Sequence, residues 1–170
     1  MDIVPLLERC IAVERQVGEV YDRLAERAAG DSELREFWGA MAQDEREHAR
    51  KLEAWRGLAA TEDVAHRSAA AGFEADLAEI EQLVAEAGRQ AAGVQSVDDA
   101  FAIALELEMS ELDAIYTTLL QSSPLSRYSD VAETRKREVE PHHEALVRAV
   151  RSRSRDEQNL TRAALIALKD

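Results

Sequence analysis

One arrangement of glutamates and histidines occurs twice along this chain, and it constrains the fold more than any other feature. A single Glu is followed by a Glu-x-x-His segment, after 31 residues in the first half and after 32 in the second. The residues are Glu14, Glu45 and His48, and then Glu108, Glu140 and His143. One Glu from each of two helices, with Glu-x-x-His from two others, is the ligand pattern of a di-iron or di-manganese site inside a helical bundle. The repeat therefore predicts a bundle built around two metal ions.

The composition favours helix throughout. The 170 residues include only three Pro and seven Gly, against many Ala, Leu, Glu and Arg, residues that lose little conformational entropy in a helix. No stretch alternates polar and apolar residues long enough to predict a sheet. We therefore expect one all-α domain spanning residues 1–170, a length that buries a core of ordinary size.

Apolar residues recur at helical spacing in several segments, which gives the expected order of the helices. A first helix pair occupies 3–56, a connection of 57–96 contains one helix, a second pair occupies 97–151, and a short amphipathic helix covers 156–168. Within these spans we expect helices at 3–29, 33–56, 73–92, from 97 through Leu119, and 129–151. The helix in the connection is interpreted as a crossover returning the chain to the starting end. The prediction is two antiparallel hairpins joined by a long crossover.

The candidate ligands can be tested by their neighbours, because a ligand inside a bundle must lie on the apolar face of its helix. Glu14, Glu45, His48 and Glu108 all have apolar residues three, four or seven positions away. Glu111 lies one turn beyond Glu108 and is a further candidate.

Charge balance favours a metal at these positions. Burying several carboxylates together costs several kcal/mol per ion unless the charge is compensated. Two divalent cations would balance four carboxylates and leave the histidines neutral as ligands. One Glu-x-x-His arises readily by chance, whereas two copies with matching glutamates rarely do. A metal-free bundle that keeps the pattern remains the alternative.

Charge and cysteine content exclude other functions. The formal net charge of −13 argues against nucleic acid as a partner, because phosphates would be repelled. Cys10 is the only cysteine, which excludes an internal disulfide and a rubredoxin-type iron centre within this chain. No signal peptide or apolar run of membrane-spanning length occurs, so we expect a soluble cytoplasmic protein without membrane contact.

These residues resemble the ferritin-like superfamily, and within it the rubrerythrin branch. The similarity rests on Glu14-x6-Tyr21 and on the segment from Asp44 to Ala49, which reads Asp-Glu-Arg-Glu-His-Ala, and it covers about 3–56 and 97–151. It implies a ferritin-like antiparallel four-helix bundle.

The resemblance also implies roles for the candidate residues. Glu45 or Glu140 would bridge the two metals, and Glu14 and Glu108 would be terminal ligands. Tyr21 would be a hydrogen-bond partner of a ligand, and it is the candidate catalytic residue.

The second half departs from the first in two respects. A constant offset of 95 residues matches Glu45 with Glu140 but sets Glu14 against Met109, so Glu108 requires a shift of one residue. Pro141 lies inside the second Glu-x-x-His, and proline in a helix interior removes a hydrogen bond and produces a kink. The spacing favours His143 as the ligand, and a kink that turns His142 inward is the alternative.

The expected function is that of a non-haem di-iron or di-manganese oxidoreductase that reacts with hydrogen peroxide or dioxygen. Rubrerythrin-like proteins are associated with peroxide reduction, and ferritin-like proteins with oxidation of ferrous iron. Two iron ions are the expected cofactors, with manganese possible, and an external protein would donate electrons. An iron-storage subunit with ferroxidase activity and a metal-free interaction bundle are the alternatives. We expect a homo-oligomer, a dimer or larger.

Overall fold

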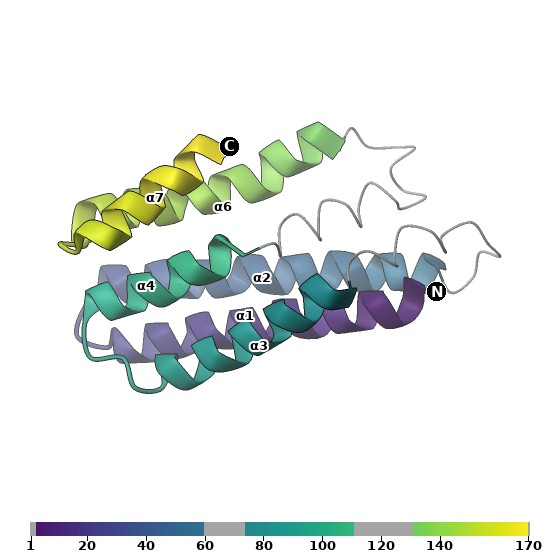
Figure 1. Ribbon diagram of the computed structural model, residues 1–170, viewed down its shortest axis with the longest axis horizontal. Helices are drawn as coiled ribbons and strands as arrows, with labels where there is room; N and C mark the ends of the chain where they lie inside the picture. The colour runs from purple at the N-terminus through teal and green to yellow at the C-terminus, as the bar shows by residue number, and fades with distance from the viewer. Residues whose placement is uncertain (1–2, 60–73, 111–130, 170) are drawn as a thin grey trace.

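The computed structural model describes residues 3–59, 74–110 and 131–169, and within these ranges all regular structure is helical (Figure 1). The helices are α1 (Ile3–Arg27), α2 (Ser32–Ala59), α3 (Glu74–Ala91), α4 (Val97–Glu108), α6 (Val131–Arg153) and α7 (Glu157–Lys169). Their axes run roughly along the long dimension of the molecule (Figure 1). The all-α prediction is confirmed.

The first two helices form a long antiparallel hairpin. The turn between them is short because Asp31 caps α2: its Oδ1 accepts hydrogen bonds from the backbone N–H groups of Glu33 and Leu34, both at 3.1 Å. These bonds satisfy two amides that a helix start leaves without intrahelical partners. The hairpin buries an almost continuous apolar face from Leu6 to Trp55.

The crossover helix α3 runs beside α1 in the same direction. Arg9, near the start of α1, holds Glu81 with two hydrogen bonds of 2.8 and 2.9 Å. Near the end of α1, Arg23 donates to the carbonyl of Gly88 at 2.7 Å, and Arg27 donates to the carbonyl of Ala92. The crossover therefore ends beside the α1–α2 turn, and the prediction that it returns to the end where the chain starts is wrong. Because α2 has already brought the chain back to that end, α3 must carry it away again.

Helix α4 starts at a capping box and ends earlier than predicted. The Ser96 hydroxyl accepts from the N–H of Asp99, and the Asp99 carboxylate accepts from the N–H of Ser96, each at 3.0 Å. At the other end, Met109 caps α4 and the Ser110 N–H turns back to the carbonyl of Leu107 at 3.0 Å. This tighter bond stops the helical ladder, so the expectation of one continuous helix through Leu119 is wrong at Met109 and Ser110. The part from Glu111 onward lies outside the described residues.

The last two helices form a second hairpin that is fastened to the rest at one end. Asp98, in the first turn of α4, accepts at Oδ1 from the Ser154 hydroxyl at 2.5 Å and from the Arg155 N–H at 3.1 Å. The buried amide of Asn159 donates to the Asp98 carbonyl at 2.9 Å. Arg153, at the end of α6, binds Asp31 at 3.1 Å. The end of α6 is thereby held against the α1–α2 turn and the start of α4.

Buried apolar residues from each of the described helices form one hydrophobic cluster, with Trp38, Trp55, Tyr21 and Phe101 as its largest fully buried members. None of the helices in the described ranges is both long enough and apolar enough to cross a membrane.

Candidate metal centre

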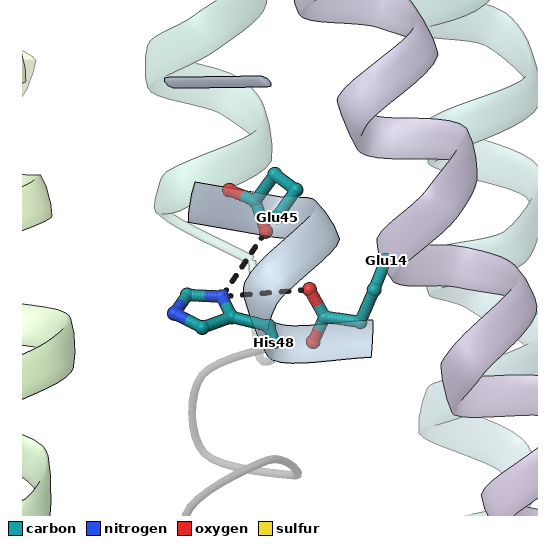
Figure 2. A group of neighbouring side chains, drawn as sticks. All are labelled: Glu14, Glu45 and His48. Carbon is teal, nitrogen blue, oxygen red and sulfur yellow. Dashed lines mark hydrogen bonds and ion pairs between the residues drawn. The ribbon is translucent and has the colours of Figure 1, made fainter. Parts of the chain in front are cut away.

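The first group of possible ligands lies between α1 and α2. Glu14, Glu45 and His48 are 2 %, 3 % and 6 % exposed, and one ligand atom of each lies within 4.8 Å of the others. His48 Nδ1 is 3.2 Å from Glu45 Oε2 and 3.6 Å from Glu14 Oε2 (Figure 2). Residues three apart on a helix share a face, which explains why Glu45 and His48 point toward the same space.

The second group joins α2 to α4 and α6. It comprises Glu45, Glu108 and His142, again with ligand atoms within 4.8 Å of one another. His142 Nε2 lies 3.1 Å from Glu108 Oε1 and 3.3 Å from Glu45 Oε1. Its other nitrogen, Nδ1, lies 3.2 Å from Asp44 Oδ2. A carboxylate at the second nitrogen fixes the orientation of a ligating imidazole.

Glu45 belongs to both groups through different oxygen atoms. Its Oε2 faces His48 in the first group and its Oε1 faces His142 in the second. A carboxylate with one oxygen on each side is the arrangement of a bridging ligand between two ions. The geometry thus gives two adjacent ligand sets, supplied by α1, α2, α4 and α6.

Tyr21 contacts the second group from α1. Its hydroxyl donates a hydrogen bond to Glu108 Oε1, and its ring is fully buried. The ring stacks on Trp38 with centroids 5.8 Å apart and an interplanar angle of 12°. The structure thus places Tyr21 against a possible ligand.

Helix α6 presents different residues to the centre from those expected. It continues through Pro141 and directs His142 at Glu45 and Glu108. His143 is also buried, with Nε2 at 3.5 Å from Glu108 Oε2, yet it belongs to neither group of described residues. Glu140 is only half-buried and is likewise in neither group. At 3.6 residues per turn, a residue two positions before His142 lies roughly 200° around the axis, which turns Glu140 away from the centre.

The geometry therefore favours the alternative reading of α6, with His142 in place of His143. It brings together Glu14, Glu45, His48, Glu108 and His142, beside Tyr21. Whether each of them ligates a metal stays a prediction, and Glu111 lies outside the described residues.

Burial and the charges of neighbouring side chains determine the electrostatics of the first group. Desolvation, with a contribution from the neighbouring Glu45 charge, raises the pKa of Glu14 to about 8. Desolvation acts to lower the pKa of His48, but the nearby carboxylates of Glu14 and Glu45 outweigh it and raise that pKa to about 11. The first group is thus a place where protons are held in the absence of another cation.

The second group is arranged as a carboxylate between imidazoles. Burial acts to raise the pKa of Glu108, but His142 and His143 hold it below its usual range. Burial acts to lower the pKa of His142, and Glu108, Asp44 and Glu45 together raise it well above 6.5.

These residues fit a pair of divalent ions. Glu14 Oε2 is buried, and among the described residues it accepts no hydrogen bond, with His48 Nδ1 at 3.6 Å. Carboxylate oxygen and imidazole nitrogen suit iron and manganese, and a cation would take the place of the protons that the group now holds. The three carboxylates of the two groups carry three negative charges, whereas two divalent ions carry four positive charges. One further anionic ligand would complete the charge balance.

Comparison with known proteins identifies the family of this chain. The rubrerythrin family matches residues 5–97, more than half of the chain, and the chain belongs to this family. No curated protein and no solved structure matches it. The matched region contains Glu14, Tyr21, Glu45 and His48 and stops as α4 begins. The inference that α4 and α6 supply possible ligands is therefore based on the structure and not on the family match.

Two contacts of the centre were not predicted from the sequence. Asp44 lies against His142, although its place next to Glu45 in the chain was a signal that it is near the metals. Trp38 stacks on Tyr21, a contact that follows from tertiary packing and that no spacing in the sequence reveals.

Proposed function

We propose that this protein is a non-haem di-iron oxidoreductase that reduces hydrogen peroxide or dioxygen. The observation that carries the proposal is Glu45, whose two oxygens face two different ligand sets. When bound, two redox-active metals supply the electrons for peroxide reduction. Manganese would accept the same donor set.

The protein's own residues would hold and orient this pair. Glu14 and His48 would hold one ion, Glu108 and His142 the other, and Glu45 would lie between them. All five side chains are well buried, so the surrounding core limits the access of water and strengthens each electrostatic contact.

Two neighbours would keep the second set in place. Asp44 orients His142 from the side facing solvent, because the Asp44 side chain is 53 % exposed whereas that of His142 is 3 % exposed. Tyr21 donates to Glu108, and this hydrogen bond holds the carboxylate at the end of α4.

Electrons would have to come from another molecule. Cys10 is the only cysteine and is buried, so this chain has no thiolate set for an iron–sulfur centre. An external one-electron donor protein is therefore part of the proposal.

Rapid mixing of the diferrous protein with peroxide tests the proposal. We expect the wild type to be oxidised faster than the Glu45→Ala variant. Glu47→Ala is the matched control, since Glu47 lies in the same turn of α2 and pairs with Arg50. Equal rates in wild type and Glu45→Ala would exclude the proposed reaction.

An iron-storage subunit would use the same centre, and assembly separates the two functions. Storage requires a large hollow shell that takes up many more than two irons per chain. Light scattering together with iron titration distinguishes this result from a small oligomer that saturates at two metals per chain.

A further inference from the structure

A pair of stacked aromatic rings connects the candidate metal centre with a surface pocket. Tyr21 and Trp38 are nearly parallel, with centroids 5.8 Å apart, and they are 0 % and 1 % exposed. Offset stacking at this separation is a stable arrangement of aromatic rings. The two rings form a continuous π contact from α1 to α2.

The inner end of the pair touches the second ligand group. The Tyr21 hydroxyl donates to Glu108 Oε1, and the Tyr21 ring meets the His142 ring edge-on, with centroids 6.4 Å apart. A phenol bonded to a buried carboxylate has an acceptor for its proton in place.

The outer end lies in the wall of a pocket. Trp38 lines a cavity of about 230 Å³ where the α1–α2 turn meets the start of α4, together with Leu34, Gly30, Val97 and Ala100. Gly30 and Val97 are exposed, so the pocket opens to solvent. A small one-electron reagent in this pocket would lie against the wall to which Trp38 contributes.

We propose that Trp38 and Tyr21 carry single electrons between the surface pocket and the metal centre. Indole and phenol are the aromatic side chains that lose one electron most readily, whereas the phenyl rings of Phe37 and Phe101, which also contact Trp38, do not. The route rests on the proposed function, because it has a use only where the centre changes its oxidation state.

Each transfer of one electron along this route balances in electrons and protons. Tyr21 gives one electron to the oxidised centre and its phenolic proton to Glu108, which breaks the O–H bond. Trp38 then gives one electron to the Tyr21 radical, which takes its proton back from Glu108. A one-electron donor at the pocket restores Trp38. The net transfer is one electron from the donor to the centre, and two such transfers supply the two electrons that one peroxide requires.

The route can be tested in the metal-free protein by photo-oxidation. A ruthenium photosensitiser is attached through Val97→Cys, at the mouth of the pocket. Cys10 does not compete for the label, because burial raises its pKa to about 12 and the thiolate is the reactive form. After a flash and oxidative quenching, transient absorption records which side chain has lost an electron.

We expect a tyrosyl radical in the labelled protein and its loss in Trp38→Phe. Trp55→Phe is the matched control, since Trp55 is an equally buried tryptophan of the same helix outside the stack, and it should retain the signal. In Tyr21→Phe the oxidation should stop at Trp38 and give an indole radical instead. Circular dichroism checks that each variant is folded, and Tyr21→Phe keeps the test decisive if Trp38→Phe is not.

A tyrosyl signal that survives Trp38→Phe, or one of full size in Tyr21→Phe, would overturn the route; the latter would place the radical on Tyr116 or Tyr128. Because the measurement needs no metal, the route and the proposed function fail separately. A protein that binds no iron but shows the Trp38-dependent radical refutes only the function. One that reduces peroxide without this radical refutes only the route.

Discussion

The α1–α2 half of the candidate centre and the α4–α6 half are built differently. Glu14, Glu45 and His48 lie in the middle of two long helices joined by a short turn, so helix periodicity and the pairing of these two helices bring them together. Glu108 is the last residue of α4, and His142 follows a proline inside α6. The second half thus depends on where a helix ends and on how α6 docks. The first half is set by local structure and the second by tertiary packing.

The sharpest test of this division is the residue that both halves share. Glu45→Gln should abolish binding of both ions, because it removes the carboxylate charge common to the two groups. Glu14→Gln should remove one ion and leave the other. Titration with ferrous or manganous ions, followed by elemental analysis, gives the stoichiometry. If Glu45→Gln still binds two ions per chain, the two groups do not form one bridged centre.

The second largest effect should distinguish the residues of α6. His142→Ala should weaken binding of the ion in the second group by at least about 100-fold, more than is typical for the loss of an outer-shell partner. Glu140→Ala, two positions earlier, should leave the affinity unchanged, since Glu140 lies in neither ligand group. The reverse order, with Glu140 essential and His142 dispensable, would restore the assignment made from spacing.

Sequence spacing could predict the first half of the centre almost completely and the second half only in part. The i, i+3 rule places Glu45 with His48, and the apolar faces of α1 and α4 identify Glu14 and Glu108. The choice of His142 over His143 depends on the rotation of α6, and the end of α4 depends on a local hydrogen bond of Ser110. Both are properties of packed three-dimensional structure, which periodicity does not encode.

Asp44→Asn should affect the second half alone. It would keep a side chain of the same size beside His142 Nδ1 while removing the charge, and loss of such a partner typically costs about 10- to 100-fold in metal affinity. Calorimetric titration should show one weakened site and one unchanged site. Asp22→Asn is a control, because Asp22 is an acidic surface residue paired with Arg46. Equal weakening of both sites would show that Asp44 acts through overall charge.

The two halves should also differ in how pH changes the stability of the metal-free protein. Glu14 and His48 have raised pKa values in the folded state, from 4.5 to about 8 and from 6.5 to about 11. The folded state therefore binds more protons than the unfolded state, and stability falls as pH rises through these ranges. Glu108 has a lowered pKa, so its contribution is present above about pH 4.5 and is lost on acidification. His142, whose pKa is raised, acts like His48 and adds to the loss of stability at rising pH.

Thermal unfolding of the metal-free protein between pH 5 and pH 9 checks this sign. We expect the melting temperature to fall steadily with rising pH, by about 2–4 °C for each kcal/mol lost. In Glu14→Gln, the plot of melting temperature against pH should be flatter between pH 4.5, the usual pKa of a Glu carboxyl, and about pH 8. A melting temperature that rises over this pH range would contradict the inference that Glu14 and His48 hold protons in the folded, metal-free protein.

The smallest expected effect probes how closely α1 and α2 approach at the first half. A Cβ placed on Gly18 would lie 3.4 Å from the Ala42 carbonyl oxygen and 3.5 Å from Glu45 Cβ, which is ordinary contact. Gly18→Ala should therefore stabilise the protein by about 0.5–1 kcal/mol, the difference in helix propensity, and leave metal affinity unchanged. Gly88→Ala is the contrasting case, because its Cβ would lie 3.2 Å from Arg23 Nη1, whose hydrogen bond joins α3 to α1. If Gly18→Ala instead lowers metal affinity, even a methyl group at this position displaces Glu45. The position of Glu45 in the first half would then depend on the small size of Gly18 as well as on helix periodicity.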